Sequence, residues 1–162
     1  MKTIRRRRKE FKTDYKKRMN LLKSEKPRVV CRITNRYIIA QYVESYEAQD
    51  KIILTVNSKD LLKHGWPENA KGSLKSIQAS YLTGYLIGKQ IKNKKLENPI
   101  ADFGMQRMIY NTRVFGFIKG LIDAGLEVQC KEEALPAEDK INGEHQKNKI
   151  KVEEIKSKID KE

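Results

Sequence analysis

Two short runs of alternating side chains, at residues 28–34 and 37–43, constrain the fold more than any other feature. Only Asn35 and Arg36 separate them, and such a two-residue link between strands is typical of a β-hairpin. Asn tolerates the left-handed backbone that a tight turn can require. The expected register pairs Thr34 with Tyr37, Arg32 with Ile39 and Val30 with Gln41.

The two faces of this hairpin differ in polarity, because side chains alternate across a strand. The apolar face is expected to pack on the core and carries Val29, Cys31, Ile33, Ile38, Ala40 and Tyr42. The other face mixes guanidinium, ring and amide groups and carries Arg28, Val30, Arg32, Thr34, Tyr37, Ile39 and Gln41. Such groups suit the RNA backbone and unstacked bases. An ordinary half-polar face in contact with solvent fits the hairpin equally well.

A third strand and a short helix are expected next. Residues 51–56 form a strand that would pair antiparallel with the second strand of the hairpin. A short helix through residues 61–63 follows, capped by Ser58 or Asp60 and stopped at Gly65.

Residues 73–93 give the strongest helix prediction, with Ser73 as N-cap and an apolar stripe along one side. Gly84 and Gly88 each disfavour a helix by about 1 kcal/mol relative to Ala. Their four-residue spacing clears one strip of the helix surface. We therefore expect this helix to lie close on a sheet.

The remaining core elements complete an α/β pattern. Residues 100–103 predict a short strand and residues 126–130 another. Between them, residues 112–124 predict a helix with Thr112 as N-cap and Gly125 at its left-handed C-terminal cap. The order predicts an α/β domain with a mixed sheet, in which an antiparallel three-strand meander joins parallel crossovers. Helices would cover one face and leave the other open.

Most of the net charge lies ahead of this domain. Residues 1–28 hold 13 Lys and Arg against 3 Asp and Glu, a net of +10 in a chain of net +14. Such a concentration repels itself unless a polyanion such as nucleic-acid phosphate neutralises it. We expect residues 1–27 to be a basic RNA-binding arm whose helix spans residues 9–23, with Phe11 and Tyr15 sharing one face. A disordered tail or a localisation signal is the alternative.

The C-terminal residues 131–162 have a different composition. They hold 8 Lys against 9 Asp and Glu and contain no aromatic residue. Ile150, Ile155 and Ile159 are spaced too sparsely to bury much surface. We expect an extended, charged tail that follows the surface of the domain at residues 28–130 and is partly disordered in isolation.

The sequence offers little for catalysis. Cys31 and Cys130 lack a CxxC spacing, His64 and His145 have no partner at metal-ligand spacing, and the glycines match no phosphate-binding loop. No apolar run approaches the ~20 residues that span a bilayer, and no apolar segment follows the first charges as in a secretion signal. We expect a soluble, cytoplasmic, non-enzymatic protein with a polyanionic partner and no cofactor, metal, membrane or small-molecule substrate.

Six stretches in a specific order also carry a family resemblance: residues 5–18, residues 27–41, residues 64–66, residues 81–88, residues 113–126 and residues 140–145. Together they resemble the 5S-rRNA-binding protein of the large ribosomal subunit, number eighteen in the universal nomenclature, in its archaeal and eukaryotic branch. The resemblance implies a structural protein that anchors 5S rRNA in the central protuberance and touches large-subunit rRNA and neighbouring ribosomal proteins. A general RNA-binding or ribosome assembly factor is the alternative.

The charge pattern, the polar hairpin face and this resemblance give one set of candidate residues for RNA binding. They are Arg5, Arg6, Arg7, Arg8, Lys9, Lys12, Tyr15, Lys16, Arg18, Lys23, Arg28, Arg32, Thr34, Asn35, Arg36 and Gln41. Replacing Arg32 and Arg36 by Glu is expected to weaken RNA binding if the polar hairpin face takes part.

Overall fold

A computed structural model of the protein describes residues 3–143 and 150–161. Its strands are β1 (Arg28–Ile33), β2 (Ile38–Tyr46), β3 (Gln49–Asn57) and β4 (Ile100–Asp102). Its α-helices are α1 (Arg6–Lys9), α2 (Tyr15–Lys23), α3 (Ile77–Asn93), α4 (Arg113–Asp123), α5 (Glu138–Asn142) and α6 (Val152–Ile159). Short 3-10 helices are η1 (Ser58–Leu62), η2 (Glu68–Ser73) and η3 (Glu132–Ala134).

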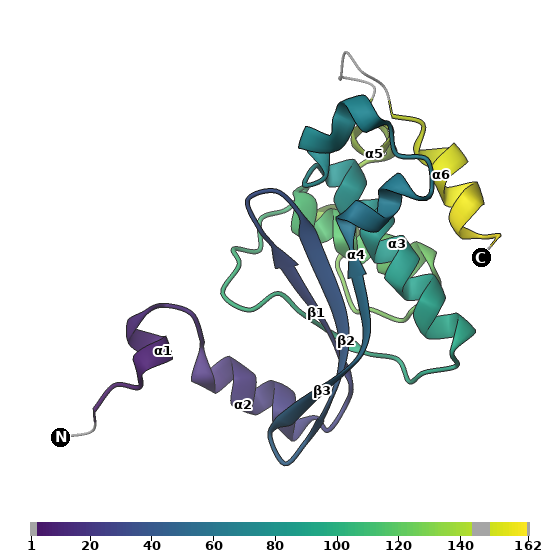
Figure 1. The fold of residues 1–162 in the computed structure, drawn as a ribbon. Coiled ribbons are helices and arrows are strands. Elements are labelled where there is room, and N and C mark those ends of the chain that lie inside the picture. Colours follow the sequence, from purple (N-terminus) through teal and green to yellow (C-terminus); the bar gives the residue numbers. More distant parts are fainter. Residues whose placement is uncertain (1–2, 144–149, 162) are drawn as a thin grey trace.

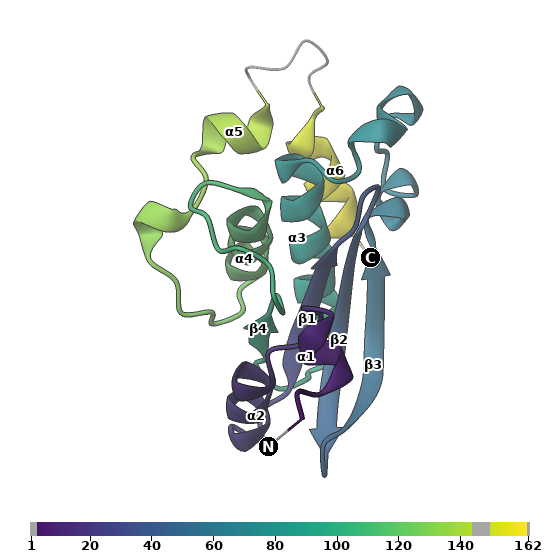
Figure 2. The same cartoon turned by 90° about the vertical axis from the view of Figure 1, so that its left-hand side faces the viewer.

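The four described strands form one mixed sheet in the order β3-β2-β1-β4 (Figure 2). β1, β2 and β3 make the antiparallel meander, and β4 runs parallel to β1. The hairpin register is the expected one, and a backbone hydrogen bond from Thr34 to the Tyr37 carbonyl closes its turn. The sequence prediction of a mixed α/β fold is confirmed.

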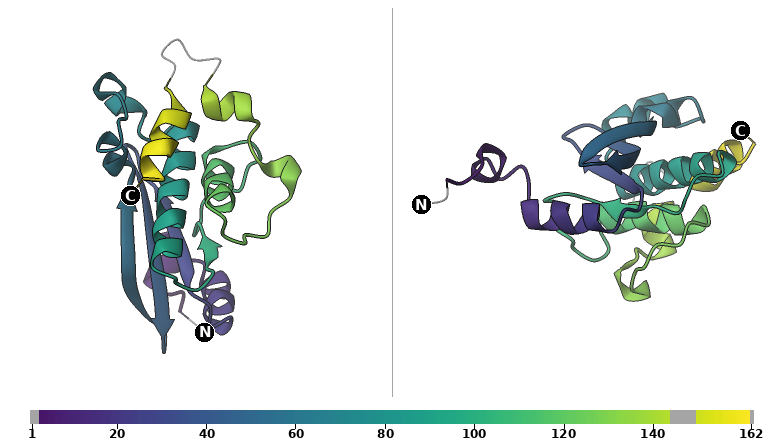
Figure 3. Two further views of the ribbon diagram at one scale, coloured as in Figure 1. Left: turned by 90° about the vertical axis from the view of Figure 1, so that its right-hand side faces the viewer. Right: turned by 90° about the horizontal axis from the view of Figure 1, so that it is seen from below.

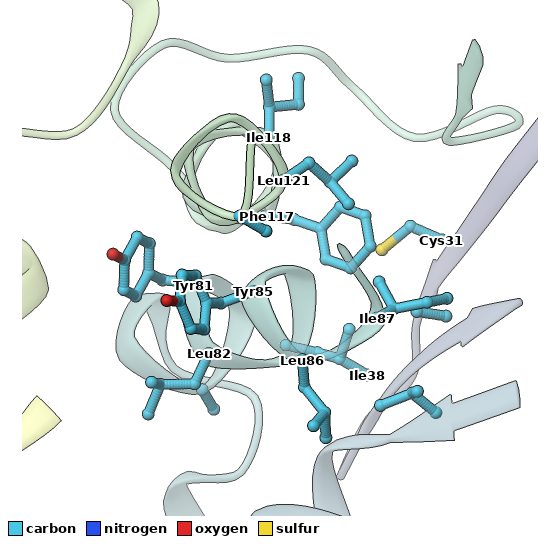
Figure 4. Packing of buried hydrophobic residues seen from close by; sticks show 14 of the residues in the cluster. Cys31, Ile38, Tyr81, Leu82, Tyr85, Leu86, Ile87, Phe117, Ile118 and Leu121 are labelled. Atoms are coloured by element: carbon cyan, nitrogen blue, oxygen red, sulfur yellow. The ribbon is translucent and has the colours of Figure 1, made fainter. Parts of the chain in front are cut away.

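Helices α3 and α4 form the layer that covers the apolar side of the sheet (Figures 1 and 3). Cys31 and Ile38 from the hairpin are fully buried against this layer. Leu86 and Ile87 from α3 and Phe117 from α4 meet them in the core (Figure 4). α3 is buried nearly all round, as expected for a helix enclosed between a sheet and other helices.

The glycines of α3 face α4 and not the sheet, which corrects the sequence prediction. A Cβ at Gly84 would overlap the backbone carbonyl of Phe117. On the opposite helix, a Cβ at Gly120 would overlap the backbone carbonyl of Tyr81. The two helix backbones therefore touch directly, which only residues without a side chain allow.

The predicted helix starts are shifted by a few residues. α3 begins at Ile77, where the hydroxyl of Ser76, and not of Ser73, accepts a hydrogen bond from Ala79 N. Asn57, with Asp60 in a reciprocal capping box, caps η1 in place of Ser58. Thr112 occupies the N-cap position of α4, but its hydroxyl donates to the Ile109 carbonyl.

The strand predicted at residues 126–130 does not form. The Leu126 amide instead donates to the Leu121 carbonyl and closes the end of α4, with Gly125 at φ +90° as expected. The Asn98 side chain then bonds both backbone groups of Glu127, at 2.9 and 3.2 Å. The Asn98 side chain thus forms the hydrogen bonds that a neighbouring strand would have made with Glu127.

The arm contains two helices where one was predicted at residues 9–23. Residues 10–14 separate α1 from α2, and Phe11 has φ +51°. The Asp14 carboxylate accepts hydrogen bonds from Lys16 N and Lys17 N and so starts a new helix. Local capping competes with continuation of the first helix, so Phe11 and Tyr15 do not share a helix face.

The C-terminal residues bury far more than their spacing suggested. Val152, Ile155 and Ile159 lie at helical spacing in α6 and are 5, 2 and 3% exposed, and Ile150 is also buried. α6 packs on α3 (Figure 3), where Asp160 accepts a hydrogen bond from the Tyr85 hydroxyl at 2.6 Å. The sequence prediction missed Val152, which completes the apolar stripe, so α6 belongs to the core.

Replacing Gly120 by Ala is expected to destabilise the fold by about 2–3 kcal/mol, because the new methyl group forces α3 and α4 apart. Urea denaturation measures this loss. The control is Gly72→Ala, since a Cβ there meets nothing within 4 Å; it should change stability by less than about 0.5 kcal/mol. Equal stability of the two variants would contradict the direct backbone contact.

Replacing Ile155 by Ala is expected to cost about 2–4 kcal/mol, because it opens a cavity beneath α6. Thermal unfolding of the full chain detects the loss, and Glu154→Ala, at an exposed position one residue away, serves as control. If the two variants unfold at the same temperature, α6 is only loosely attached to the domain.

Candidate nucleic-acid interface

The basic arm is docked on the domain through α2. Arg18 donates to the Asp50 carboxylate at 3.1 Å and to the Ala48 carbonyl at 3.4 Å, next to the β2–β3 turn. Lys17 Nζ donates to the Gly104 carbonyl at 3.1 Å, beyond β4. α2 therefore leaves the body at one end of the sheet face that α3 and α4 leave open, and α1 lies farther out (Figures 1 and 3).

A buried ion cluster lies beneath α2. The Arg28 guanidinium is 2% exposed and contacts the carboxylates of Asp50 at 2.8 Å and Asp102 at 3.3 Å. It also donates to the Ser45 hydroxyl at 2.8 Å. Arg28 was predicted to lie on the exposed polar face, and this expectation is wrong because the side chain is buried against Asp50, Asp102 and Ser45. The buried Arg28 guanidinium therefore holds neighbouring residues in place and is not itself part of the exposed surface.

Asp50 joins the buried cluster to the arm, because its two oxygens bind Arg28 and Arg18 separately. Partial burial by itself would raise the pKa of this carboxyl. Hydrogen bonds from Arg18 and Ser45 and the nearby Arg28 charge outweigh burial and lower the pKa of Asp50 below its ordinary value. Asp50 is therefore ionised at neutral pH and binds both cations.

Arg32 lies between the buried cluster and solvent. Its side chain is 46% exposed and 3.5 Å from the Asp102 carboxylate. It also donates to the backbone carbonyls of Cys31 and Asp102, each at 2.9 Å. These contacts fix the guanidinium at the wall of a cavity of about 460 Å³ beneath α2. The same cavity is lined by Arg7, Lys12, Lys17 and Arg18.

The first helix of the arm presents its cations to solvent. α1 buries none of its residues, and Arg6 and Lys12 share Glu10 at 3.2 and 2.8 Å. Arg5 lies over the Tyr15 ring at 5.1 Å, so this ring is occupied by the arm itself. The remaining predicted arm residues with exposed side chains are Arg7, Arg8, Lys9, Lys16 and Lys23.

The hairpin residues divide into exposed and structural ones. Asn35 and Arg36 are exposed at the turn. Thr34 is also exposed, but its hydroxyl bonds both backbone groups of Tyr37 and so shapes the turn. Gln41 is half-buried and lies 3.5 Å from the Thr55 hydroxyl on β3. The structure thus brings the arm and Arg32 together and leaves Arg36 at the far end of the hairpin.

Several residues around this surface were not singled out by the sequence. Asp50 and Asp102 were missed because the register and the position of α2 are needed to bring them to Arg28. The loop after β4 was missed as well, although its run of apolar residues next to Arg107 is visible in the sequence. Met105, Met108, Ile109 and Tyr110 in this loop are 46–53% exposed.

The other candidate groups do not assemble into a site among the described residues. His64 is buried in the turn after η1, and His145 lies outside the described residues. Burial raises the pKa of the Cys31 thiol to about 12, so this thiol is unreactive. Across residues 3–143 and 150–161, His, Cys, Asp and Glu form no group of three or more that could hold a metal ion. No helix in these ranges is long and apolar enough to cross a bilayer.

Comparison with known proteins identifies the family. The family model described as "Ribosomal large subunit proteins 60S L5, and 50S L18" matches residues 1–101. The large ribosomal subunit protein uL18 of Korarchaeum cryptofilum is 46% identical over 140 residues, which cover 86% of this chain and 70% of that protein. The uL18 proteins of Caldivirga maquilingensis and Aeropyrum pernix are 42 and 39% identical, over 86% of this chain and 66 and 64% of theirs.

The matched region contains the basic arm, the β1–β3 meander and α3, and the alignments with the relatives extend over most of the chain. The chain therefore belongs to the uL18 family of large ribosomal subunit proteins, whose members are structural components of the ribosome and not enzymes.

Proposed function

We propose that this chain binds 5S rRNA and helps to anchor it in the central protuberance of the large subunit, next to large-subunit rRNA and neighbouring ribosomal proteins. One observation carries the proposal: the arm at residues 1–27, with 12 Lys and Arg against 3 Asp and Glu, is held at the open sheet face by Arg18 and Lys17. The cations of the arm and Arg32 therefore present one basic surface to a folded polyanion.

The buried cluster gives this surface a defined geometry. Arg28, Asp50 and Asp102 hold α2 in place before any RNA is bound. A docked arm loses less conformational entropy on binding than a free one, and this strengthens the complex. Exposed arginines then contact phosphates with two parallel hydrogen bonds each, which lysine cannot reproduce.

Binding of 5S rRNA and general RNA binding lead to different expectations for this surface. A general factor that uses only the charge of the arm would bind any RNA of similar length equally well. A protein that recognises one folded RNA with a fixed arm and a fixed hairpin should prefer 5S rRNA over an unrelated RNA of the same length.

Replacing Arg5, Arg6, Arg7 and Arg8 together by Gln is expected to lower the affinity for 5S rRNA and to reduce its salt dependence. Each lost phosphate contact lowers the slope of log K against log salt by roughly 0.7–0.9, so we expect a change of about 3. The fold should be unaffected because α1 buries no residue. Filter binding over a series of salt concentrations measures both quantities.

The control replaces four exposed lysines outside the arm and the hairpin, Lys63, Lys71, Lys75 and Lys161, by Gln and so changes the net charge equally. It should keep the slope within about 1 of the parent value. Equal effects of the two variants, or equal affinity of the parent for 5S rRNA and an unrelated RNA of the same length, would overturn the proposal.

Asp50→Asn tests whether the placement of the arm matters beyond its charge. The substitution raises the net charge by one, which alone would strengthen RNA binding. It also removes the charge that holds Arg18 and Arg28, so we expect 5S rRNA affinity to fall by about fivefold. Asp139→Asn adds the same charge at an exposed position on α5 and should not weaken binding. A tighter complex with Asp50→Asn would mean that only charge counts.

A further inference from the structure

The loop that joins β4 to α4 exposes apolar side chains beside cations. Met105, Met108, Ile109 and Tyr110 are each about half exposed, in a run of six residues. Arg107 lies within this run and Arg113 follows it, both with exposed side chains. Apolar side chains gathered in this way on a soluble protein mark a binding surface more often than scattered ones do.

The shape of this loop is fixed by bonds to the rest of the domain. Gln106 N donates to the Phe103 carbonyl at 3.2 Å, and Asn111 N donates to the Ala134 carbonyl at 3.0 Å. The Tyr110 ring packs edge-on against Phe115 of α4, with 5.5 Å between ring centroids. The apolar side chains therefore stay exposed because the backbone is anchored on both sides.

The loop forms one wall of a cavity of about 580 Å³. Four cations line it, Lys12, Arg32, Arg107 and Arg113, together with Met105 and Ile109. None of the described residues that line this cavity is acidic. The neighbouring cavity beneath α2, in contrast, contains the carboxylates of Asp14, Asp50 and Asp102. The acids of this region are thus confined to the side on which the arm docks.

We propose that this cavity binds an unpaired stretch of rRNA, with phosphates on Arg107, Arg113 and Arg32 and a base on Met105 and Ile109. The partner must be anionic, because four cations line the cavity and none of its described lining residues is acidic, and it must offer apolar surface to the exposed loop. Arg32 and Lys12 are each paired with an acid that does not line the cavity, Asp102 and Glu10, so the charges of Arg107 and Arg113 matter most. Single-stranded RNA has both properties, whereas a duplex conceals the faces of its bases. The inference rests on the proposed function and adds a second RNA contact to it.

The cavity is continuous with the surface beneath the arm. Arg32, Gly104 and Met105 line both cavities, so RNA held by the arm passes directly to the loop. Gly104 has φ +60°, and a Cβ there would lie 3.1 Å from the Arg32 guanidinium. The absence of a side chain at Gly104 keeps the passage open. The proposed RNA path therefore leaves the sheet at its β4 edge and not across β3.

Two substitutions in the full chain separate the charged and apolar contributions. Arg107→Glu is expected to weaken binding of a single-stranded uridine octamer by about tenfold and to lower the salt slope by roughly 0.7 or more. Ile109→Thr is expected to weaken it by about threefold without changing the slope, because an apolar contact releases no counterions. Both side chains are exposed, so neither change should unfold the protein, and circular dichroism checks this.

The controls match charge and exposure elsewhere on the molecule. Lys161→Glu reverses an exposed charge just after α6. Ile52→Thr alters an isoleucine on β3 whose exposed fraction, 53%, equals that of Ile109. Each should change octamer affinity by less than about twofold. A second measurement needs no variant: a 4-thiouridine octamer crosslinked to the parent protein should label the peptide that contains residues 105–110.

Three results would overturn the inference. The first is that both loop variants bind the octamer as tightly as the parent does. The others are that crosslinks are confined to the arm, or that the parent binds a polyglutamate peptide more tightly than the octamer. 5S rRNA distinguishes this failure from failure of the proposed function. A parent that prefers 5S rRNA while the loop variants bind it equally well retains the proposed function and loses only the loop site. A parent without that preference loses the proposed function whatever the loop variants do.

Discussion

The burial of Arg28 between Asp50 and Asp102 is the interaction on which the functional surface depends. Removing one partner of such a buried pair typically costs about 3–5 kcal/mol, because the remaining charge is left without compensation. The three groups come from β1, β3 and β4, so the cluster ties together strands on both sides of the sheet centre. Since Asp50 also binds Arg18, the same interaction determines where the basic arm lies.

The direct contact of α3 with α4 explains why one sheet face remains available to the arm. Gly84 and Gly120 let the two helix backbones touch, so both helices and α6 pack as one layer on the apolar side. Among the described residues, the arm and the loop after β4 lie on the polar side. Larger side chains between α3 and α4 would displace α4 and the loop that leads into it. Packing in the core therefore determines the position of the surface formed by this loop.

The sequence was sufficient where a pattern reports local geometry. The hairpin register and the parallel β4 follow from alternation and element order. It was insufficient where burial depends on another segment. Arg28 lies on the face that alternation assigns to it, but acids from β3 and β4 enclose its guanidinium there, and no periodicity within β1 reports this. Residues 126–130 alternate like a strand but find their backbone bonded by Asn98. The isoleucines of α6 are too few to bury much surface by themselves, but together with Val152 they cover one side of α3.

The distribution of acids over the open face then decides where a polyanion can bind. Asp50 and Asp102 bind Arg18, Arg28 and Arg32 at the base of the arm, while Asp14 caps α2 through backbone amides. The cavity at the loop after β4 has no acid among its described lining residues, and Arg107 and Arg113 are exposed there. In a protein of net +14, acids therefore hold some cations in the structure and leave others exposed. The proposed RNA surface depends on these few carboxylates as well as on its many arginines, because Asp50 fixes where the arm lies.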